Sequence, residues 1–302
     1  MVNTLDTVVS IPVVVFDQSG AINEQETTAV SDRMVRHGIS VLTVNGNTGE
    51  FYSLSSEERR VAVKIGTQFS DRAELVAGVG LDLETAKEDG EFAVKNGCQH
   101  LMVHQPPHPF VSSEGWLQYH IEIANSFPDV NIIPYIKSTH VSVETIFQLI
   151  ESAPNIGAVK YALEDSSKFG YLVSEAPRDI TWICGVAEKW APPFWSVTGV
   201  SAFTSGLANV SPKVSLDLYR ALKSNDTTEI VRLWKLVNSF EELRSQSASE
   251  NNVSVVKEAL AQLGWAAPKV RAPISKVDSA TSRSVETFLS ELKKAGYIDG
   301  ED

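Results

Sequence analysis

The sequence has few cysteines, no basic surplus and no long apolar run, and each shortage excludes a class of protein. Lys and Arg number 26 against 38 Asp and Glu, for a net charge of −12. This charge argues against binding to nucleic acid or to an anionic membrane, because both need basic patches. The two cysteines, Cys98 and Cys184, lack metal-site spacing and indicate a reducing compartment, although the sequence leaves a disulfide between them open.

The sequence also lacks a segment that would take it into a membrane. Residues 8–16 are apolar, but they are too short for a span and Pro12 interrupts them. No basic segment precedes them, as a secretory signal would require. No other run approaches roughly 20 apolar residues. We therefore expect a soluble cytoplasmic protein with no membrane or nucleic-acid partner.

Short β-branched runs alternate with segments of helical periodicity over the first 225 residues. The runs are hydrophobic on both sides, which is typical of parallel strands covered by helices. Eight such units in this length predict an α/β fold, a (β/α)8 TIM barrel. A doubly wound open sheet is the alternative, but the turn at residues 17–20 lacks its glycine-rich phosphate loop. The strands are expected at residues 8–16, 40–44, 75–79, 101–103, 131–135, 157–160, 181–184 and 200–204.

Helix starts and a C-terminal helical segment complete the expected architecture. Asn23 followed by Glu26, and Ser55 followed by Glu58, have the spacing of capping boxes. Beyond the barrel, helices are expected at residues 229–247, 252–263 and 282–295, and the apolar residues of the first have helical spacing typical of core. The sequence thus predicts a barrel catalytic domain at residues 1–225 and a three-helix extension at residues 226–302.

Two residues at the ends of predicted strands could carry chemistry, since a TIM barrel builds its active site there. Lys160 ends the sixth strand, and burial in a pocket would lower its pKa and make the amine a nucleophile. The alternative is a lysine that pairs with Glu164 or Asp165. Tyr135 ends the fifth strand, where it is either a proton shuttle or an ordinary buried tyrosine.

The turn after the second predicted strand, residues 45–50, contains two glycines and small polar residues. Its free backbone N–H groups could hold a carboxylate, as anion-binding nests do, or the segment could be an ordinary loop. Together with Lys160 and Tyr135, it describes an imine-forming lysine, a proton shuttle and a carboxylate-binding turn in one barrel.

Residues 45–59, NGNTGEFYSLSSEER, resemble the Gly-Thr-Thr-Gly-Glu and Leu-Ser…Glu-Arg signature of the dihydrodipicolinate synthase/N-acetylneuraminate lyase family. The spacing to Tyr135 and Lys160 also matches. Further matches lie at residues 114–115, 208–212 and 256–273, so that the resemblance covers nearly the whole chain. It implies a class I lyase acting on a small 2-keto acid, without a separate cofactor because a covalent lysine imine with the substrate serves instead. It also implies a homo-oligomer, a dimer or a tetramer.

The resemblance also implies roles for individual residues. Lys160 would form the Schiff base, and Tyr135 would relay protons while hydrogen-bonded to Thr48. Backbone N–H groups near Asn47 and Thr48, in the turn that includes Gly49, would bind the substrate carboxylate. Glu50 would be structural.

The sequence departs from the synthase pattern at positions that would set the substrate. Asn47 stands where synthases have the first Thr, and His108 lies near the position of an aromatic residue that reaches a neighbouring subunit. After Tyr135 the sequence reads Ile-Lys-Ser-Thr-His, with His140 near the position of an arginine that binds the aldehyde substrate. We expect His108, Lys137 and His140 to contact the distal part of the substrate. Thr204, Ser205 and Asn209 are expected to line the pocket mouth.

The segment from Gly49 to Leu54 is more similar to the 5-dehydro-4-deoxyglucarate dehydratase branch of keto-deoxy sugar-acid enzymes. The chemistry agrees, because a C2 iminium can lose a C3 proton to give an enamine that expels a C4 hydroxyl, and the same iminium permits C3–C4 cleavage. The sequence thus predicts dehydration or aldol cleavage of a 2-keto-3-deoxy sugar acid. The alternatives are a synthase that condenses pyruvate with aspartate semialdehyde, and a keto-acid-binding protein without activity. A metal-dependent aldolase would need a cluster of His and carboxylate ligands at the strand ends, and the sequence predicts no metal site.

Overall fold

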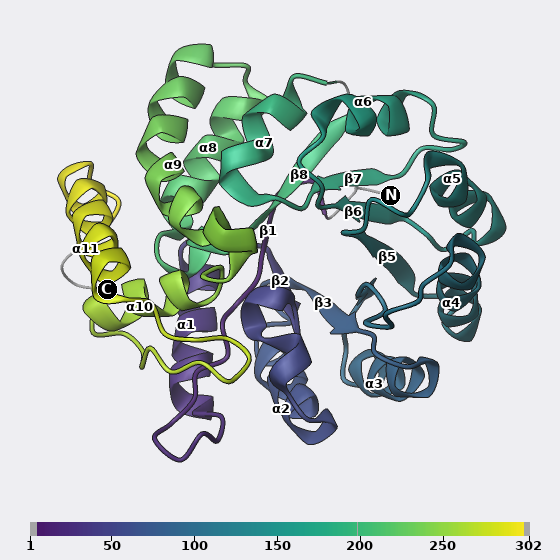
Figure 1. Cartoon of the computed structure of the whole chain (residues 1–302), viewed down its shortest axis with the longest axis horizontal. Helices are drawn as coiled ribbons and strands as arrows, with labels where there is room; N and C mark the ends of the chain where they lie inside the picture. Colours follow the sequence, from purple (N-terminus) through teal and green to yellow (C-terminus); the bar gives the residue numbers. More distant parts are fainter. Residues whose placement is uncertain (1–4, 198, 299–302) are drawn as a thin grey trace.

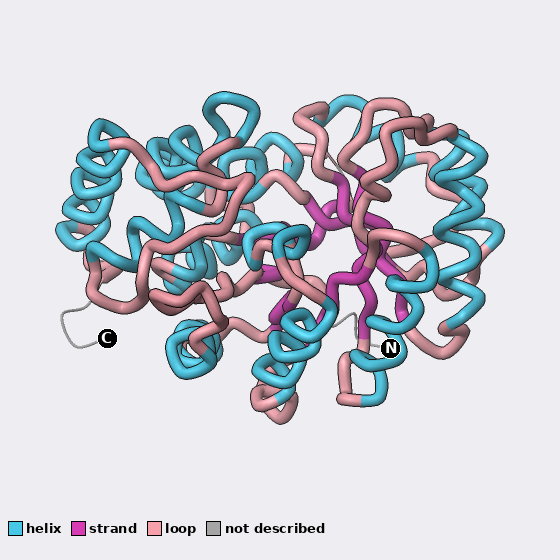
Figure 2. Tube along the Cα trace, turned by 60° about the horizontal axis from the view of Figure 1, so that its bottom comes forward, coloured by secondary structure: helices cyan, strands magenta, loops and turns pink. Residues whose placement is uncertain are grey.

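The computed structural model describes residues 5–197 and 199–298 and has a closed barrel at its centre. Eight parallel strands in these residues pair in chain order, with the last strand hydrogen-bonded to the first. Figure 2 shows the strands gathered at the centre and the helices around them. The TIM-barrel prediction is confirmed. The strands are β1 (Val8–Ser10), β2 (Val41–Val44), β3 (Glu74–Val79), β4 (His100–Val103), β5 (Asn131–Ile136), β6 (Ala158–Tyr161), β7 (Thr181–Cys184) and β8 (Val200–Ser205).

A helix follows each strand and returns the chain to the start of the next. The helices of the barrel are α1 (Glu24–Arg36), α2 (Ser56–Thr67), α3 (Leu83–Lys95), α4 (Ser113–Ser126), α5 (Val143–Ser152), α6 (Ser166–Ser174), α7 (Ala187–Trp195) and α8 (Pro212–Lys223). Short 3-10 turns occur at η1 (Asn47–Gly49), η2 (Phe51–Ser53) and η3 (Leu207–Asn209).

Side chains fill the barrel from both faces of its strands. A large cluster packs between the sheet and the surrounding helices, while a second cluster lies inside the barrel. This division follows from strand geometry, because successive side chains point to opposite faces. The interior is therefore a packed core, and a pocket can open only above it, at the strand ends. The buried residues of the interior cluster are Leu5, Val9, Val41, Val76, Met102, Ile133, Tyr135, Ala158, Ile183 and Ala202.

The first strand is shorter than the sequence predicts. Residues 11–16 are buried, but they leave the sheet after Ser10. Side chains from other elements take over their backbone donors: Val13 N–H donates to Asn209 Oδ1 at 2.9 Å and Val15 N–H to Thr27 Oγ1 at 3.0 Å. Pro12 has no N–H to contribute to a ladder. The apolar run is thus a buried loop supported by η3 and α1.

The two predicted helix starts differ in detail. At α2, Ser55 and Glu58 form both bonds of a capping box, as predicted. At α1, Asn23 accepts a hydrogen bond from the Glu26 N–H, but the Glu26 carboxylate accepts from Ala267 N–H at 3.1 Å instead of completing the box. Glu26 therefore links α1 to the C-terminal segment.

Three further helices, α9 (Thr227–Ser249), α10 (Ser254–Gln262) and α11 (Ser279–Lys294), follow the barrel. Figure 1 shows them together on one side of it, and α9 packs against α7 and α8. The last turns of α9 are irregular, since Ser247 and Ala248 have positive φ of 49° and 57°. The buried Lys257 of α10 pairs with the buried Glu50 after η1, which ties the extension to the loop that follows β2.

Both cysteines are buried and free, and burial raises the pKa of each thiol to about 12. No helix among the described residues is both long and apolar enough to cross a membrane.

Candidate active site

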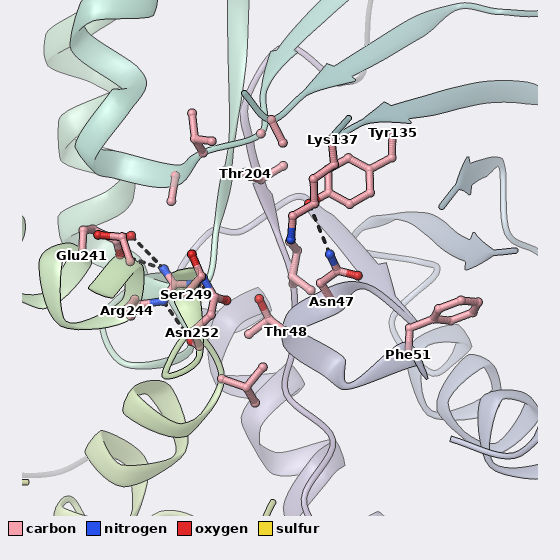
Figure 3. A pocket seen from close by; sticks show the side chains of 18 of the residues that line it. Asn47, Thr48, Phe51, Tyr135, Lys137, Thr204, Glu241, Arg244, Ser249 and Asn252 are labelled. Carbon is pink, nitrogen blue, oxygen red and sulfur yellow. Dashed lines mark hydrogen bonds and ion pairs between the residues drawn. The ribbon is translucent and has the colours of Figure 1, made fainter. Parts of the chain in front are cut away.

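A cavity of about 430 Å³ opens at the carboxyl ends of the strands. Its walls come from the loops after β2, β5, β6, β7 and β8, and from α9 and the segments that follow it. Figure 3 shows Asn47, Tyr135 and Lys137 on one side and the side chains of α9 on the other. Of the predicted site residues, the lining includes Asn47, Thr48, Tyr135, Lys137, Lys160 and Thr204.

Lys160 is the next-to-last residue of β6, and its side chain lines this cavity and is only 3% exposed. Its Nζ lies 3.8 Å from Met102 Sδ and 4.1 Å from the centroid of the Tyr135 ring. Desolvation, and next the positive charge of Lys137, lower the pKa of Lys160 to about 7. Burial disfavours the ammonium form, so a large fraction of Lys160 is neutral amine near neutral pH. Among the residues that the structure describes, neither Glu164 nor Asp165 forms an ion pair with Lys160.

Tyr135 lies beside Lys160 because β5 and β6 pair with these two residues in register. The tyrosine is 5% exposed, and burial raises its pKa above the ordinary value. Its hydroxyl accepts a hydrogen bond from Asn47 Nδ2 at 3.2 Å. The sequence-based assignment of this contact to Thr48 is therefore corrected: Thr48 lines the cavity, while the preceding residue contacts the phenol.

The turn after β2 holds Asn47 and Thr48 rigidly. Gly49 N–H donates to Gly46 C=O at 3.0 Å, and Glu50 N–H donates to Asn47 C=O at 3.0 Å. Gly49 is buried outside the lining residues, and a Cβ there would lie 3.1 Å from the Pro12 carbonyl oxygen. Gly49 thus allows the turn to approach the loop after β1. The buried Glu50 pairs with Lys257, in agreement with a structural role.

An aromatic wall supports the Tyr135 side of the cavity. The fully buried His104 stacks on Phe51, with ring centroids 4.0 Å apart, and meets the Tyr135 ring edge-on at 5.9 Å. Its Nε2 is 2.8 Å from Asn45 C=O. Desolvation lowers the pKa of His104 to about 3, so the ring is neutral. Sequence reasoning assigned no role to His104, because its contacts join segments far apart in the chain.

Three predicted specificity residues lie at different depths. Lys137 lines the cavity, and its side chain is exposed to solvent there. The protein around the side chain still removes part of its hydration, and this desolvation lowers the pKa of Lys137. His108 and His140 are exposed on the loops after β4 and β5. The structure thus brings Lys137, but neither histidine, to the cavity wall of the described chain.

Of the three residues predicted after β8, only Thr204 lines the cavity. Ser205 points the other way and donates to Glu188 Oε1 at 2.5 Å, as expected for the next residue in a strand. Asn209 Nδ2 donates to Ile11 C=O and Gly206 C=O, and its Oδ1 accepts from Val13. The side chains of Ser205 and Asn209 therefore form buried hydrogen bonds behind the cavity wall and do not lie at the pocket mouth.

Sequence reasoning missed the wall that the C-terminal helices supply. Arg244 of α9 is 4% exposed, donates to both oxygens of Glu241 at 2.8 and 2.9 Å, and donates to the Asn252 carbonyl and side-chain oxygens at 3.2 Å each. The cluster lines the cavity together with Ser249. The i, i+3 spacing of Glu241 and Arg244 was a sequence signal for the ion pair, but only the fold places it at the barrel mouth.

This arrangement can perform imine chemistry. A neutral buried amine is a nucleophile for a ketone, and the adjacent phenol can supply and accept protons. The large cavity above them has room for more than a three-carbon keto acid. Among the described residues, no group of three His, Cys, Asp or Glu side chains is arranged to hold a metal ion.

Comparison with known proteins gives a match to the model of the dihydrodipicolinate synthetase family over residues 4–292. Curated relatives include proteins named "Probable 5-dehydro-4-deoxyglucarate dehydratase". The one from Acinetobacter baumannii is 26% identical over 95% of this chain and 95% of its own length. The one from Saccharopolyspora erythraea is 26% identical over 86% of this chain and 84% of its own length.

Solved structures give a different name at higher identity. The dihydrodipicolinate synthase from Bacillus clausii is 36% identical, with a TM-score of 0.92 over 96% of this chain and 98% of its own. That from Oceanobacillus iheyensis is 33% identical, with a TM-score of 0.92 over 96% of this chain and 97% of its own. The two sets of names share the family and differ in the reaction.

Proposed function

This chain belongs to the dihydrodipicolinate synthetase family of lyases, and from this premise we propose that it forms a Schiff base between Lys160 and a 2-keto acid. The observation that carries the proposal is the buried Lys160 amine, with its pKa lowered to about 7, against the Tyr135 ring. The amine attacks the C2 ketone, and Tyr135 moves protons at the reacting atoms. Thr48, with the backbone N–H groups of its turn, binds the C1 carboxylate.

The proposed reaction is dehydration or aldol cleavage of a 2-keto-3-deoxy sugar acid, similar to that of a 5-dehydro-4-deoxyglucarate dehydratase. The names of the curated relatives support this substrate class. The size of the cavity supports a substrate longer than pyruvate, and Lys137 offers a positive charge to its distal part. The chemistry needs no separate cofactor, since the iminium itself withdraws electrons from C3.

The second candidate is condensation of pyruvate with aspartate semialdehyde, because the solved structures with that name are 33% and 36% identical. To separate the two reactions, the purified protein is incubated either with 5-dehydro-4-deoxyglucarate or with pyruvate and aspartate semialdehyde. Mass spectrometry then identifies the products. We expect turnover of the sugar acid that Lys160→Ala abolishes. Turnover of the aldehyde pair alone would favour the synthase. Keto-acid binding with no turnover of either would indicate a protein without activity.

We also propose that the protein is a homo-oligomer, a dimer or a tetramer, in the cytoplasm. The Phe110 side chain, on the loop after β4, is 87% exposed, which favours a contact with a second copy. Light scattering should give a multiple of 33.0 kDa; the monomer mass would contradict the proposal.

A further inference from the structure

Asn47 contacts the proposed proton shuttle through a group that can only donate. Its Nδ2 lies 3.2 Å from the Tyr135 hydroxyl oxygen. Its Oδ1 is buried and has no hydrogen-bond partner among the described residues. An amide nitrogen has N–H donors and no lone pair to accept a proton at neutral pH. The phenol oxygen therefore faces a hydrogen-bond donor that cannot take its proton.

We propose that Asn47 is a positioning residue that stabilises the phenolate form of Tyr135 in each proton transfer, rather than a residue that binds substrate. The inference rests on the imine chemistry proposed above. It assigns a specific step to Asn47: the amide bond to the phenol oxygen strengthens when that oxygen becomes negative, because hydrogen bonds to charged groups are roughly twice as strong as neutral ones.

The proton balance shows where the phenolate arises. Lys160 forms a C–N bond to C2, and the carbinolamine C–O bond then breaks. Tyr135 gives its proton to the departing hydroxide, which leaves as water, so that a positive iminium faces a negative phenolate. The phenolate removes a proton from C3 to give a neutral enamine and the phenol again. If the enamine expels a C4 hydroxyl, that C–O bond breaks and the phenol proton leaves with it as a second water.

The other groups around Tyr135 supply little to the phenolate. His104 is neutral, because burial lowers its pKa to about 3. Burial raises the pKa of Tyr52 to about 12, so its phenol is also uncharged, and its hydroxyl donates to the Gln105 carbonyl. The positive charge that faces the phenolate thus comes from the Lys160 iminium, with Lys137 beside it on the cavity wall, and the hydrogen bond comes from Asn47. The positive charge and the hydrogen bond come from different residues, so a substitution of Asn47 removes the hydrogen bond and leaves the Lys160 side chain in place.

The test uses pyruvate as the probe, since its methyl protons are the C3 protons of a keto acid. Purified protein in D2O is given pyruvate, and NMR follows the replacement of methyl hydrogen by deuterium. Asn47→Asp keeps the shape of the side chain and removes the donor, Asn47→Leu removes all polarity, and Asn47→Thr restores a hydroxyl that can donate. We expect the first two to slow exchange at saturating pyruvate by roughly 10- to 100-fold.

The control readouts separate this role from a structural one. Prolonged borohydride reduction with pyruvate should still label Lys160 in every variant, because the reduction is irreversible and captures even an imine that forms slowly. Asn47→Thr should recover most of the exchange rate. Wild-type exchange rates in Asn47→Asp and Asn47→Leu would overturn the role of Asn47 while leaving the imine intact. Failure to trap pyruvate in the wild-type protein would overturn both proposals.

Discussion

Lys137 lies close enough to Lys160 for its positive charge to disfavour protonation of the Lys160 amine. Desolvation is the larger cause of the lowered pKa of Lys160, and Lys137 adds to it. Because the neutral amine is the nucleophile, lowering its pKa increases the reactive fraction at neutral pH. Lys137 therefore affects the rate through Lys160 as well as through any contact with substrate.

This pair predicts the pH dependence of imine formation. The rate with pyruvate should fall below about pH 7, where Lys160 gains its proton, by about tenfold per pH unit. Lys137→Met removes one like charge, so the pKa of Lys160 should rise and the acidic limb should move to higher pH. A stopped-flow or trapping pH profile measures the shift. Lys223→Met, on the exposed end of α8, is the matched control and should leave the limb in place.

The ion pair between Lys257 and Glu50 is buried at both ends, with no exposed side-chain surface. Lys257→Met should lower the free energy of unfolding by roughly 3–5 kcal/mol, because it leaves a buried carboxylate without its counter-charge. Denaturant titration measures this change. The double variant Glu50→Gln, Lys257→Met should regain much of the loss, and a double variant no more stable than the single one would contradict this explanation.

At the scale of elements, a buried carboxyl joins α7 to β8 and α8. Glu188 Oε1 accepts hydrogen bonds from Ser205 and from Ser215, at 2.5 and 2.6 Å. Desolvation, and next the charge of Glu241, raise the pKa of Glu188 to about 7. The folded state therefore holds a proton that the unfolded chain releases near the ordinary glutamate pKa of 4.5.

The sign of this difference predicts how stability depends on pH. Between about pH 4.5 and 7 the folded state binds more protons at Glu188 than the unfolded state, so this group favours folding at low pH and the benefit is lost as pH rises. Glu188→Gln should remove this pH dependence of the free energy of unfolding. The stability of the variant minus that of the wild type should therefore be higher at pH 8 than at pH 5. Thermal unfolding at the two pH values measures it; an identical pH dependence in both proteins would refute the assignment.

Several elements could be predicted from sequence because their signals are local. The alternation of apolar runs and helical segments predicts the barrel, and the Ser55 to Glu58 spacing predicts a capping box that the structure confirms. The extent of β1 could not be predicted, because the donors of Val13 and Val15 are satisfied by Asn209 and Thr27, far away in sequence or outside the sheet.

The candidate site was predictable to a similar extent. Lys160 and Tyr135 lie near the ends of consecutive strands, so parallel pairing alone brings them together. The choice between Asn47 and Thr48 as partner of Tyr135 depends on the geometry of a 3-10 turn, which sequence does not specify. Ser205 follows Thr204 but faces α7 and α8, since neighbouring strand residues alternate between faces.

At the scale of the whole molecule, the C-terminal helices form part of the site. Arg244 and Asn252 line the cavity, and Lys257 neutralises Glu50 from α10. The division into a barrel of residues 1–225 and an extension of residues 226–302 remains a sequence-based prediction. It describes the order of elements along the chain, whereas the contacts cross that boundary.

These contacts predict the behaviour of a chain cut after residue 225. It should be insoluble or should unfold at least 10 °C below the full chain, because the loss of several kcal/mol shifts the midpoint by a few degrees for each kcal/mol. The cut exposes the faces of α7 and α8 that pack on α9 and leaves Glu50 unpaired. Expression of both chains and thermal unfolding test this. A soluble fragment with the full-length midpoint would show that the barrel folds independently.

The central claim is that Lys160 forms an imine with a 2-keto acid. The most direct measurement is borohydride reduction in the presence of pyruvate, followed by intact-mass spectrometry and peptide mapping, with Lys160→Ala as the control. The account predicts one reduced pyruvate adduct per chain, located on Lys160 and absent from the variant. No adduct with pyruvate or with longer 2-keto acids, or an adduct on another lysine, would contradict it.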